Sequence, residues 1–408
     1  MSRIAVIGAG IAGLSAAYFL SRKHEVWLFE KEPRLGGHTH THSVNGLNID
    51  TGFIVYNEAT YPNLIRLFTE LGVETQVSDM SFSVFDPVSG FRYSSNGLEG
   101  FFCDRRNWIR PGHYKLGLDI LRFNREAGKL LESGEDIKLG DYLQREGFSQ
   151  AFQDLYLFPM ASAIWSTSLG QVKLFPALTL VRFFANHNLL SVNQHHTWRA
   201  VKGGSSSYIE PISRPFRDRA ILGATIESIG HSSDGIEIHM AAGNVLKFDE
   251  VVFACRAGEA LRLLKSPIEK EREILGSFQT SLNQAWLHTD ETLLPEPGMA
   301  RASWNCILGN SGPAALTYHM NRLQTLPGQT QYCVTLNAVA RIDPAKVIKK
   351  LEYYHPLYTR EAIAAQGRWH EISGQRGIHY CGAYWFYGFH EDGLNSGIRV
   401  ARSLGVDC

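Results

Sequence analysis

Hydrophobic positions follow distinct patterns along the chain, and each pattern predicts a different kind of element. Uninterrupted apolar runs at 4–7, 26–29 and 251–254 are typical of strands in a parallel sheet, which are buried on both faces. Apolar residues spaced three or four apart at 64–71 and at 116–130 predict amphipathic helices. The buried strands and the amphipathic helices together indicate an α/β fold.

The middle and second half of the chain add other elements. Four segments between 283 and 338 alternate apolar and polar residues, which predicts an antiparallel sheet. Three short strand patterns between 220 and 248 predict a meander, and 113–200 is mostly helical. We therefore expect two domains, which a length of 408 residues can support. The predicted boundaries are 1–75, 200–265 and 370–408 for a discontinuous first domain, and 76–199 and 266–369 for the second.

The first apolar run leads directly into a glycine-rich turn. Gly8-Ala9-Gly10-Ile11-Ala12-Gly13 has the spacing G-x-G-x-x-G, and an Ala-rich helix follows it. In that setting the first glycine allows a tight turn, the second lets backbone N–H groups approach a pyrophosphate, and the third lets the helix pack closely on the sheet. The helix N-terminus adds unpaired donors and the positive end of its dipole. The motif predicts a dinucleotide site.

The next strand supports that prediction. It ends on Glu30, 22 residues after Gly8, where an acid can accept hydrogen bonds from ribose hydroxyls and would repel a 2′-phosphate. A further glycine pair, Gly36-Gly37, follows within the stretch RLGGH and permits another close approach of the backbone. We interpret this second close approach of the backbone to the cofactor as favouring FAD over a nicotinamide dinucleotide that binds and dissociates.

Composition narrows the class of protein. Lys plus Arg and Asp plus Glu both number 40, so no overall basic field favours nucleic acid as a partner. The six cysteines are far apart and form no C-x-x-C pair, which predicts reduced thiols in a cytoplasmic protein. No transmembrane helix is predicted, and the apolar N-terminus is better explained as strand, turn and helix than as a signal peptide. The histidines at 38, 40 and 42 have no local carboxylate or Cys beside them, so no metal site is predicted.

Four blocks of the sequence, in order, jointly resemble the flavin amine oxidase superfamily, which includes monoamine oxidases, protoporphyrinogen oxidase and phytoene desaturases. The blocks are the fingerprint with RLGGH, the stretch from DTG at 50–52 to Gly72, the KGG at 202–204, and the C-terminal CGA…GFHEDGLNSG. The resemblance therefore spans most of the chain. It implies a Rossmann-like, glutathione-reductase-like FAD-binding domain with a parallel sheet and a three-stranded meander. A second, α+β substrate domain would contain an antiparallel sheet and a helical part.

The resemblance also implies where FAD lies. The adenosine diphosphate half would be held by Gly8, Ala9, Gly10, Ile11, Ala12, Gly13, Glu30, Lys31, Arg34, Gly36, Gly37 and His38. The adenine would meet the backbone of Ile226, and the isoalloxazine would lie beside Thr51, Gly52 and Phe53. The pyrophosphate, ribityl and pyrimidine end would be covered by Gly382, Glu391, Asp392 and Leu394. Ala383 stands where many relatives have an acid, so the ribityl contact would fall to the backbone or to Asp392. Non-covalent flavin is expected, because Cys381 precedes the glycine instead of lying further on as in monoamine oxidases.

The sequence indicates the candidate catalytic residues less clearly than the cofactor-binding residues. A flavin carries the redox step itself, so hydride abstraction needs no protein nucleophile. His390 would lie beside the flavin, either as a catalytic base or, as we favour, as a residue that hydrogen-bonds its neighbours. Phe389 falls about where amine oxidases place an aromatic residue. Tyr56 and His319 are weaker candidates, for which a surface phenol and a strand-edge imidazole are the simpler interpretations.

The function that we favour is an FAD-dependent oxidoreductase that removes hydride from a largely apolar substrate. The segments DTGFIVYNEATYPNL, SDMSFSV, LRFNRE and YHMNRLQ are similar to a bacterial branch of NAD/FAD-binding oxidoreductases. That resemblance implies desaturation of methyl-branched or unsaturated acyl chains and a lipid methyltransferase partner of the cyclopropane-fatty-acid-synthase type. A flavin amine oxidase, a non-redox flavin-dependent isomerase and a binding protein with vestigial FAD are the alternatives. We expect a cytoplasmic protein with peripheral contact to the inner membrane face. The helix at 174–190 is predicted as core, with a tunnel wall or a membrane-facing surface as the alternative.

Overall fold

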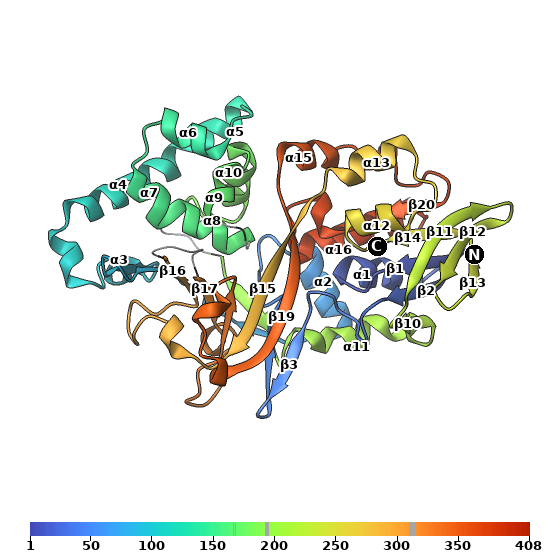
Figure 1. Ribbon diagram of the computed structural model, residues 1–408, viewed down its shortest axis with the longest axis horizontal. Coiled ribbons are helices and arrows are strands. Elements are labelled where there is room, and N and C mark those ends of the chain that lie inside the picture. Colours follow the sequence, from blue (N-terminus) through green and yellow to red (C-terminus); the bar gives the residue numbers. More distant parts are fainter. Residues whose placement is uncertain (166, 168, 192–195, 310–314) are drawn as a thin grey trace.

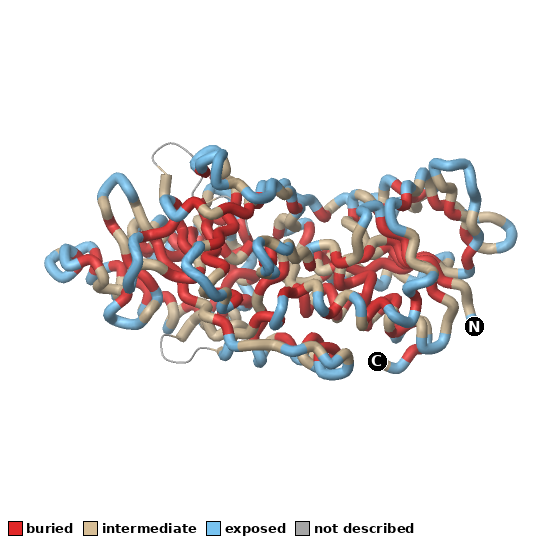
Figure 2. The backbone as a smooth tube through the Cα atoms, turned by 90° about the horizontal axis from the view of Figure 1, so that it is seen from below, coloured by how far each residue is buried: buried red, intermediate tan, exposed pale blue. Residues whose placement is uncertain are grey.

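The protein is elongated and consists of two lobes (Figure 1). The computed structural model describes residues 1–165, 167, 169–191, 196–309 and 315–408. Both termini lie in one lobe, and most of the helices between 111 and 186 lie in the other. Buried residues run through both lobes (Figure 2), so each lobe has a hydrophobic core.

The lobe with the termini is built on a five-stranded parallel sheet in the order β10-β2-β1-β14-β20. The strands come from distant parts of the chain and are β1 (Arg3–Ile7), β2 (Glu25–Glu30), β10 (Ala220–Leu222), β14 (Glu250–Phe253) and β20 (Ile378–Tyr380). In β1, Ile4 and Val6 face one core, whereas Ala5 and Ile7 face the other. Both faces of the sheet are covered, which explains the uninterrupted apolar runs.

Different layers cover the two faces of this sheet. One face packs against α1 (Ile11–Leu20), α2 (Pro62–Leu71), α11 (Ile209–Ser213) and α16 (His390–Ser403). The other packs against the meander β11 (Ile226–Ser232), β12 (Gly235–Met240) and β13 (Val245–Phe248), with α12 (Ala257–Leu263), α13 (Glu269–Gly276) and α15 (Arg360–Gln366). The core on this face includes residues of α13 and α15, which lie in the segment 266–369 that we assigned to the second domain. The domain boundaries stay a prediction.

The other lobe contains a seven-stranded sheet in the order β19-β15-β18-β17-β16-β7-β8. Its strands are β7 (Phe82–Asp86), β8 (Phe91–Ser94), β15 (Thr280–His288), β16 (Trp304–Ile307), β17 (Ala315–His319), β18 (Cys333–Leu336) and β19 (Val347–Pro356). The pairing is antiparallel as predicted, except that β7 and β16 are parallel. The sheet extends beyond the predicted segments at 283–338, because the paired strands β7 and β8 join it at one end and β19 at the other.

A helical part shares one core with this sheet. Its helices are α3 (Gly97–Phe101), α4 (Pro111–Glu126), α5 (Gly128–Ser133), α6 (Leu139–Arg145), α7 (Gln150–Phe152), α8 (Phe158–Trp165), α9 (Leu169–Val172) and α10 (Ala177–Asn186). The predicted apolar stripe at 116–130 is buried, but it spans α4 and α5 because the first helix ends at Glu126. The apolar side chains of α10, including Leu180 and Phe184, are buried in this core, as the core interpretation of 174–190 predicted.

Shorter elements connect the lobes. β3 (Thr41–Val44) pairs with β4 (Leu47–Asp50), and β9 (Trp198–Val201) lies between β5 (Val55–Asn57) and β6 (Thr75–Val77). A short helix, α14 (Met320–Leu323), follows β17. In the part of the chain that the structure describes, no helix combines the length and the apolarity needed to cross a bilayer.

Candidate cofactor and substrate site

The glycine-rich turn after β1 has the geometry that its sequence predicts. Gly8 has φ +107°, and its N–H donates to the carbonyl oxygen of Phe29 at 2.8 Å, which ties the turn to β2. A Cβ atom on Gly13 would overlap the carbonyl oxygen of Gly8. Glycine is therefore needed at both positions, one for its backbone conformation and the other for close packing of α1 on the turn.

The N-terminus of α1 is suited to a pyrophosphate. No side chain caps it, and its first residues, Ile11, Ala12 and Gly13, are buried. A Cβ atom built on Gly10, the N-cap residue, would meet no atom within 4 Å. The turn therefore combines open space with unpaired backbone donors at the positive end of a helix dipole. These features fit the diphosphate of FAD.

Glu30 lies next to this turn. It is buried, and its Oε2 accepts a hydrogen bond from Ala9 N–H at 2.7 Å while its Oε1 accepts one from Glu32 N–H at 2.9 Å. The carboxylate is therefore fixed at the end of β2 beside the glycines, where a ribose adjoining the pyrophosphate would lie. Lys31, by contrast, is exposed and forms an ion pair with Glu259 at 3.2 Å.

The RLGGH loop lies against the first glycine turn. Gly36 N–H donates to the carbonyl oxygen of Ala9 at 2.8 Å. The Arg34 guanidinium donates to the carbonyl oxygens of Gly37 at 2.8 Å and Thr39 at 3.1 Å, so it holds the loop in a closed conformation. The structure thus brings both glycine motifs together, as the sequence predicted.

The segment after this loop meets β19, which the sequence analysis did not include. His38 stacks on Tyr353 with ring centroids 5.2 Å apart. The Tyr353 hydroxyl lies 2.8 Å from Thr51 Oγ1 and 3.2 Å from His40 Nδ1. Burial, assisted by the positive charge of Arg34, lowers the pKa of His38 to about 4. Tyr353 and His355 therefore join the candidate site; both lie on the same face of β19 as Leu351.

His390 and Phe53 form a second contact that holds the site together. Their rings are stacked, with centroids 3.6 Å apart. The Nε2 atom of His390 lies 2.9 Å from the hydroxyl of Tyr208 and 3.1 Å from Thr39 Oγ1. Burial lowers the pKa of His390 to about 3, so its imidazole is neutral at ordinary pH. Tyr208, which was not predicted, follows the KGG stretch.

The remaining C-terminal residues are arranged around the start of α16. Glu391 accepts hydrogen bonds from the N–H groups of Asn63 at 3.0 Å and Leu64 at 2.8 Å, so its carboxylate caps α2. Asp392 accepts one from Phe389 N–H at 2.9 Å, and burial raises its pKa to about 7. Of two further predicted residues, Gly382 is buried and its N–H donates to Ser396 Oγ of α16 at 2.8 Å, and Leu394 is a buried residue of α16 itself.

Residues from the other parts of the predicted site have distinct positions. Ile226 opens β11, in the meander. Gly52 lies against the loop at 38, because a Cβ atom on it would overlap the carbonyl oxygen of His38. Among the described residues, no cluster of three or more His, Cys, Asp or Glu side chains could hold a metal.

Two of the simpler interpretations need correction. Tyr56 is not a surface phenol but a buried residue that packs against Tyr61 and Phe68. His319 does lie at the end of β17, but it is buried, with its Nε2 atom 2.7 Å from Gln331 Oε1.

Phe389, the residue before His390, belongs to a cluster of aromatic side chains. The ring of Phe389 stacks on that of Phe183 of α10, with centroids 5.0 Å apart. Phe183 also contacts Trp165 at 4.7 Å and His187 at 3.8 Å between ring centroids. The cluster connects the helical part of one lobe with the start of α16 in the other.

A family model described as "flavin containing amine oxidoreductase" matches residues 11–347. The chain belongs to this family. Membership confirms the predicted superfamily and makes FAD the expected cofactor, in agreement with the fit of the glycine turns and Glu30. The methyltransferase-associated branch stays a prediction.

Curated relatives are similar over part of their length. The flavin-containing, monoamine oxidase-like protein AofH of Mycobacterium tuberculosis is 25% identical over 58% of this chain and 53% of its own length. The 15-cis-phytoene desaturase of Synechococcus elongatus is 26% identical over 40% of this chain and 37% of its own. Protoporphyrinogen oxidase 2 of Arabidopsis thaliana is 27% identical over 50% of this chain and 41% of its own. The chain thus matches about half or less of each of these relatives.

Solved structures confirm the fold over the whole chain. Putrescine oxidase superposes with a TM-score of 0.72 at 14% identity, covering 99% of this chain and 98% of that one. A fatty acid isomerase from P. acnes that produces CLA superposes with a TM-score of 0.72 at 16% identity, covering 99% of both chains. The predicted α/β fold class is therefore correct.

Proposed function

We propose that the protein is an FAD-dependent oxidoreductase that removes hydride from a largely apolar substrate, with a methyl-branched or unsaturated fatty acyl chain as the preferred candidate. The observation that carries this proposal is the aromatic cluster of Phe389, Phe183 and Trp165, which adjoins the predicted flavin side of the site. Aromatic and aliphatic walls recognise apolar ligands by the area that they bury.

The acids beside this cluster support the same substrate class. Glu391 is engaged with the backbone of α2, and Asp392 is engaged with the backbone of Phe389. The raised pKa of Asp392 also keeps this group partly neutral near pH 7. A cationic amine would therefore find no free carboxylate at the start of α16. Phe183 covers one face of the Phe389 ring, so only the other face of this ring is left to contact a substrate.

The chain's own residues would bind and orient the reactants. Gly10 and the first turn of α1 would hold the diphosphate of FAD, and Glu30 would hold the adjoining ribose. When bound, FAD supplies the hydride acceptor. Phe53 and His390, whose rings stack on one another, would fix the position of the substrate relative to the cofactor. The aromatic cluster would exclude water from the reacting carbon.

Two other functions have support from the comparisons. The similarity to AofH and to putrescine oxidase favours an amine oxidase as the second candidate. The superposition on a fatty acid isomerase favours a flavin-dependent isomerase acting on an acyl chain. A lipid methyltransferase partner is a further proposal that rests on the sequence resemblance.

An anaerobic reaction of the purified flavoprotein separates these candidates. Phospholipids with methyl-branched chains, a free unsaturated fatty acid and putrescine would be added separately, while flavin absorbance and product mass are recorded. Bleaching by an acyl substrate, with a product lighter by two hydrogens, supports the proposal. Bleaching by putrescine alone, or an acyl product of unchanged mass, overturns it in favour of the oxidase or the isomerase.

A pair of variants tests the role of the aromatic cluster. We expect Phe389→Ala to slow flavin reduction by acyl substrates at least about tenfold, or about 1.4 kcal/mol, because it removes an aromatic surface against which the substrate would bury apolar area. Tyr354→Ala, an exposed aromatic change on β19, serves as the control and should leave the rate unchanged. Equal rates in both variants at normal flavin content would remove the cluster from the substrate site.

A further inference from the structure

Exposed apolar side chains are concentrated at the tip of the helical lobe. Of the sixteen large hydrophobic side chains that are exposed in the described part of the chain, six lie within residues 98–121. They are Leu98, Trp108, Ile109, Tyr114, Leu118 and Leu121, and we call them the apolar tip. Trp108 is 59% exposed and Ile109 is 83% exposed. Contiguous exposed apolar groups of this kind mark interaction surfaces.

α4 shows this most clearly, because it has apolar residues on two sides. Leu116, Ile120 and Phe123 are buried in the core. Tyr114, Leu118 and Leu121 recur at helical spacing on the exposed side. A surface helix packs on its own domain through one apolar face, so the second apolar face of α4 is not explained by packing within the chain. Some partner outside the chain would cover it.

Aromatic side chains are ordered at the tip. Phe102 stacks on Trp108 with centroids 4.4 Å apart, and the Tyr114 hydroxyl donates to the carbonyl oxygen of Trp108 at 2.9 Å. The exposed side chains are thus presented on a rigid surface. Trp and Tyr are the residues that favour the boundary between lipid headgroups and acyl chains.

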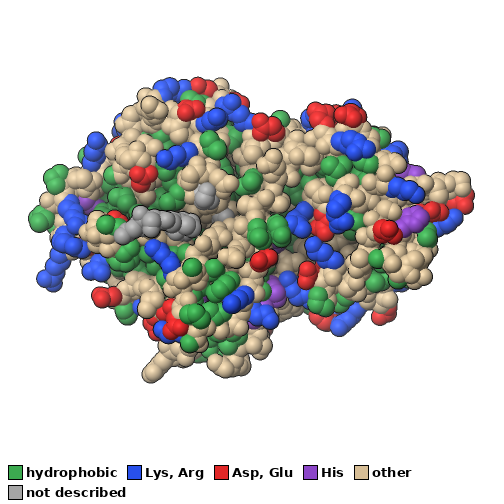
Figure 3. Space-filling view, viewed as in Figure 1, with side chains coloured by type: hydrophobic (Ala, Val, Ile, Leu, Met, Phe, Trp, Pro, Cys, Tyr) green, Lys and Arg blue, Asp and Glu red, His purple; other side chains and the backbone are tan. Residues whose placement is uncertain are grey.

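The same surface is basic, although the whole chain has no net charge. Residues 98–125 contain six Lys or Arg against three Asp or Glu. Asp104 and Asp119 are buried and pair with Arg106 and Arg122. Arg105, Arg110 and Lys115 form no ion pair with the described residues; we call them the basic rim. Figure 3 shows Lys and Arg side chains beside hydrophobic ones at this end of the molecule.

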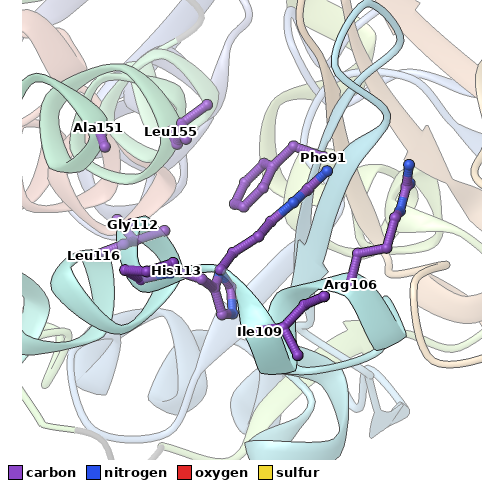
Figure 4. A pocket seen from close by; sticks show the side chains of 10 residues that line it. Phe91, Arg106, Ile109, Gly112, His113, Leu116, Ala151 and Leu155 are labelled. Atoms are coloured by element: carbon purple, nitrogen blue, oxygen red, sulfur yellow. The ribbon is translucent and has the colours of Figure 1, made fainter.

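A hollow opens on this surface. It has a volume of about 550 Å³ and lies between η1 (Arg105–Ile109), the start of α4, Phe91 of β8 and Leu155 (Figure 4). Phe91, Leu116 and Leu155 contribute apolar side chains to its lining, which also includes Arg106 and Arg110. Its size is within the range of ligand pockets, and its lining would accept apolar groups from the same partner that meets the basic rim.

We propose that the apolar tip and the basic rim dock the protein on an anionic lipid bilayer. Exposed Trp, Tyr, Leu and Ile side chains insert at the headgroup level, and the rim cations attract the lipid phosphates. A second copy of the chain fits this surface less well, because a two-fold interface would bring the same cations against each other. The peripheral membrane contact expected from the sequence, which had no assigned location, is thus placed at 98–121; the membrane-facing surface at 174–190 was only the alternative to a core helix. Docking requires no turnover, so it stands independently of the proposed function.

Vesicle binding by the purified full-length protein tests this proposal. Two sets of vesicles would be used, phosphatidylcholine alone and phosphatidylcholine mixed with phosphatidylglycerol. We expect co-sedimentation with the anionic vesicles only, weakened by added salt. Leu118→Asp and the double variant Arg105→Glu/Lys115→Glu should each bind at least about tenfold more weakly.

Matched controls lie outside the tip. Leu174→Asp changes a side chain that is 60% exposed, compared with 66% for Leu118, and Arg272→Glu reverses an exposed charge on α13. Both should bind like the unmodified protein. Equal binding to both vesicle types, or equal loss in controls and tip variants, would overturn the proposal. So would a dimer in solution that Leu118→Asp dissociates while neither vesicle type is bound.

Discussion

The ring of Phe53 lies flat on the imidazole of His390, with centroids 3.6 Å apart and planes inclined by 7°. The edge of the imidazole is also engaged, since its Nε2 atom lies 2.9 Å from the Tyr208 hydroxyl. An imidazole held in this way is desolvated, which lowers its pKa to about 3. His390 thus has the features of a positioning residue.

Kinetics can distinguish this role from that of a base. We expect His390→Gln to slow flavin reduction by less than about 100-fold, because general bases contribute 10²–10⁴-fold. The pH profile between 5 and 8 should keep its shape, since a group with a pKa of about 3 does not titrate there. A profile that falls below about pH 6.5 in the unmodified protein, and loses this fall in the variant, would instead identify His390 as the base.

Burial of His390 also predicts how stability depends on pH. Its pKa is lower in the folded chain than in the unfolded chain, so the unfolded chain binds more protons between about pH 6.5 and pH 3. Its contribution is therefore complete above about pH 6.5 and is lost as the pH falls, by about 2 kcal/mol at pH 5.

Urea unfolding at pH 7 and pH 5 measures this contribution. We expect the loss of stability on acidification to be smaller in His390→Gln than in the unmodified protein. Asp50 and Asp392 act in the opposite direction, because burial raises their pKa values to about 6 and 7, but both are present in the two proteins. Identical pH dependence in the two proteins would contradict the low pKa of His390.

Gly10 provides the test of the cofactor site. A Cβ atom there meets no atom of the chain within 4 Å, so Gly10→Val should fold with the melting temperature of the unmodified apoprotein. The valine side chain would occupy the space of the diphosphate, and we expect the purified variant to lose its flavin absorbance. Gly13→Val is the contrasting change, because its Cβ atom would overlap the Gly8 carbonyl oxygen and destabilise the chain itself. Full flavin content in folded Gly10→Val would refute the assignment.

Glu30 is expected to set affinity for the ribose. Glu30→Gln retains the shape of the side chain but removes its charge, and a hydrogen bond to a charged group contributes about 1.5–3 kcal/mol. FAD titrated into the apoprotein should therefore bind at least about tenfold more weakly. Glu32→Gln, an exposed change two residues away, is the control and should bind FAD normally.

The cofactor half of the site was predictable because its signals are local. Strand, turn and helix follow one another within residues 3–20, and Gly8, Gly10 and Gly13 have their roles fixed by this short geometry. The same argument explains why the helix at 64–71 was predicted correctly as part of α2, since its helical spacing is visible in the sequence.

The substrate half was less predictable because its contacts join distant segments. Tyr353 reaches Thr51 across 302 positions, and no pattern near Thr51 indicates that pairing. β19 was also overlooked, because its lysines and tyrosines leave little contrast between its two faces. Long-range pairing of this kind depends on the register of β15 and β19, which the sequence does not reveal by itself.

Glu391 gives the last prediction, because the structure assigns it a role that the resemblance did not. Its two carboxylate oxygens accept from the N–H groups of Asn63 and Leu64, so it satisfies backbone donors at the start of a helix 327 positions away from it. Removing such a cap costs about 0.5–2 kcal/mol. We expect Glu391→Ala to lower the free energy of unfolding by that amount, measured by urea denaturation. Glu391→Gln should lose less stability than Glu391→Ala, because its amide oxygen can still accept one of the two hydrogen bonds. Equal free energies of unfolding for the two variants and the unmodified protein would show that α2 does not depend on this contact.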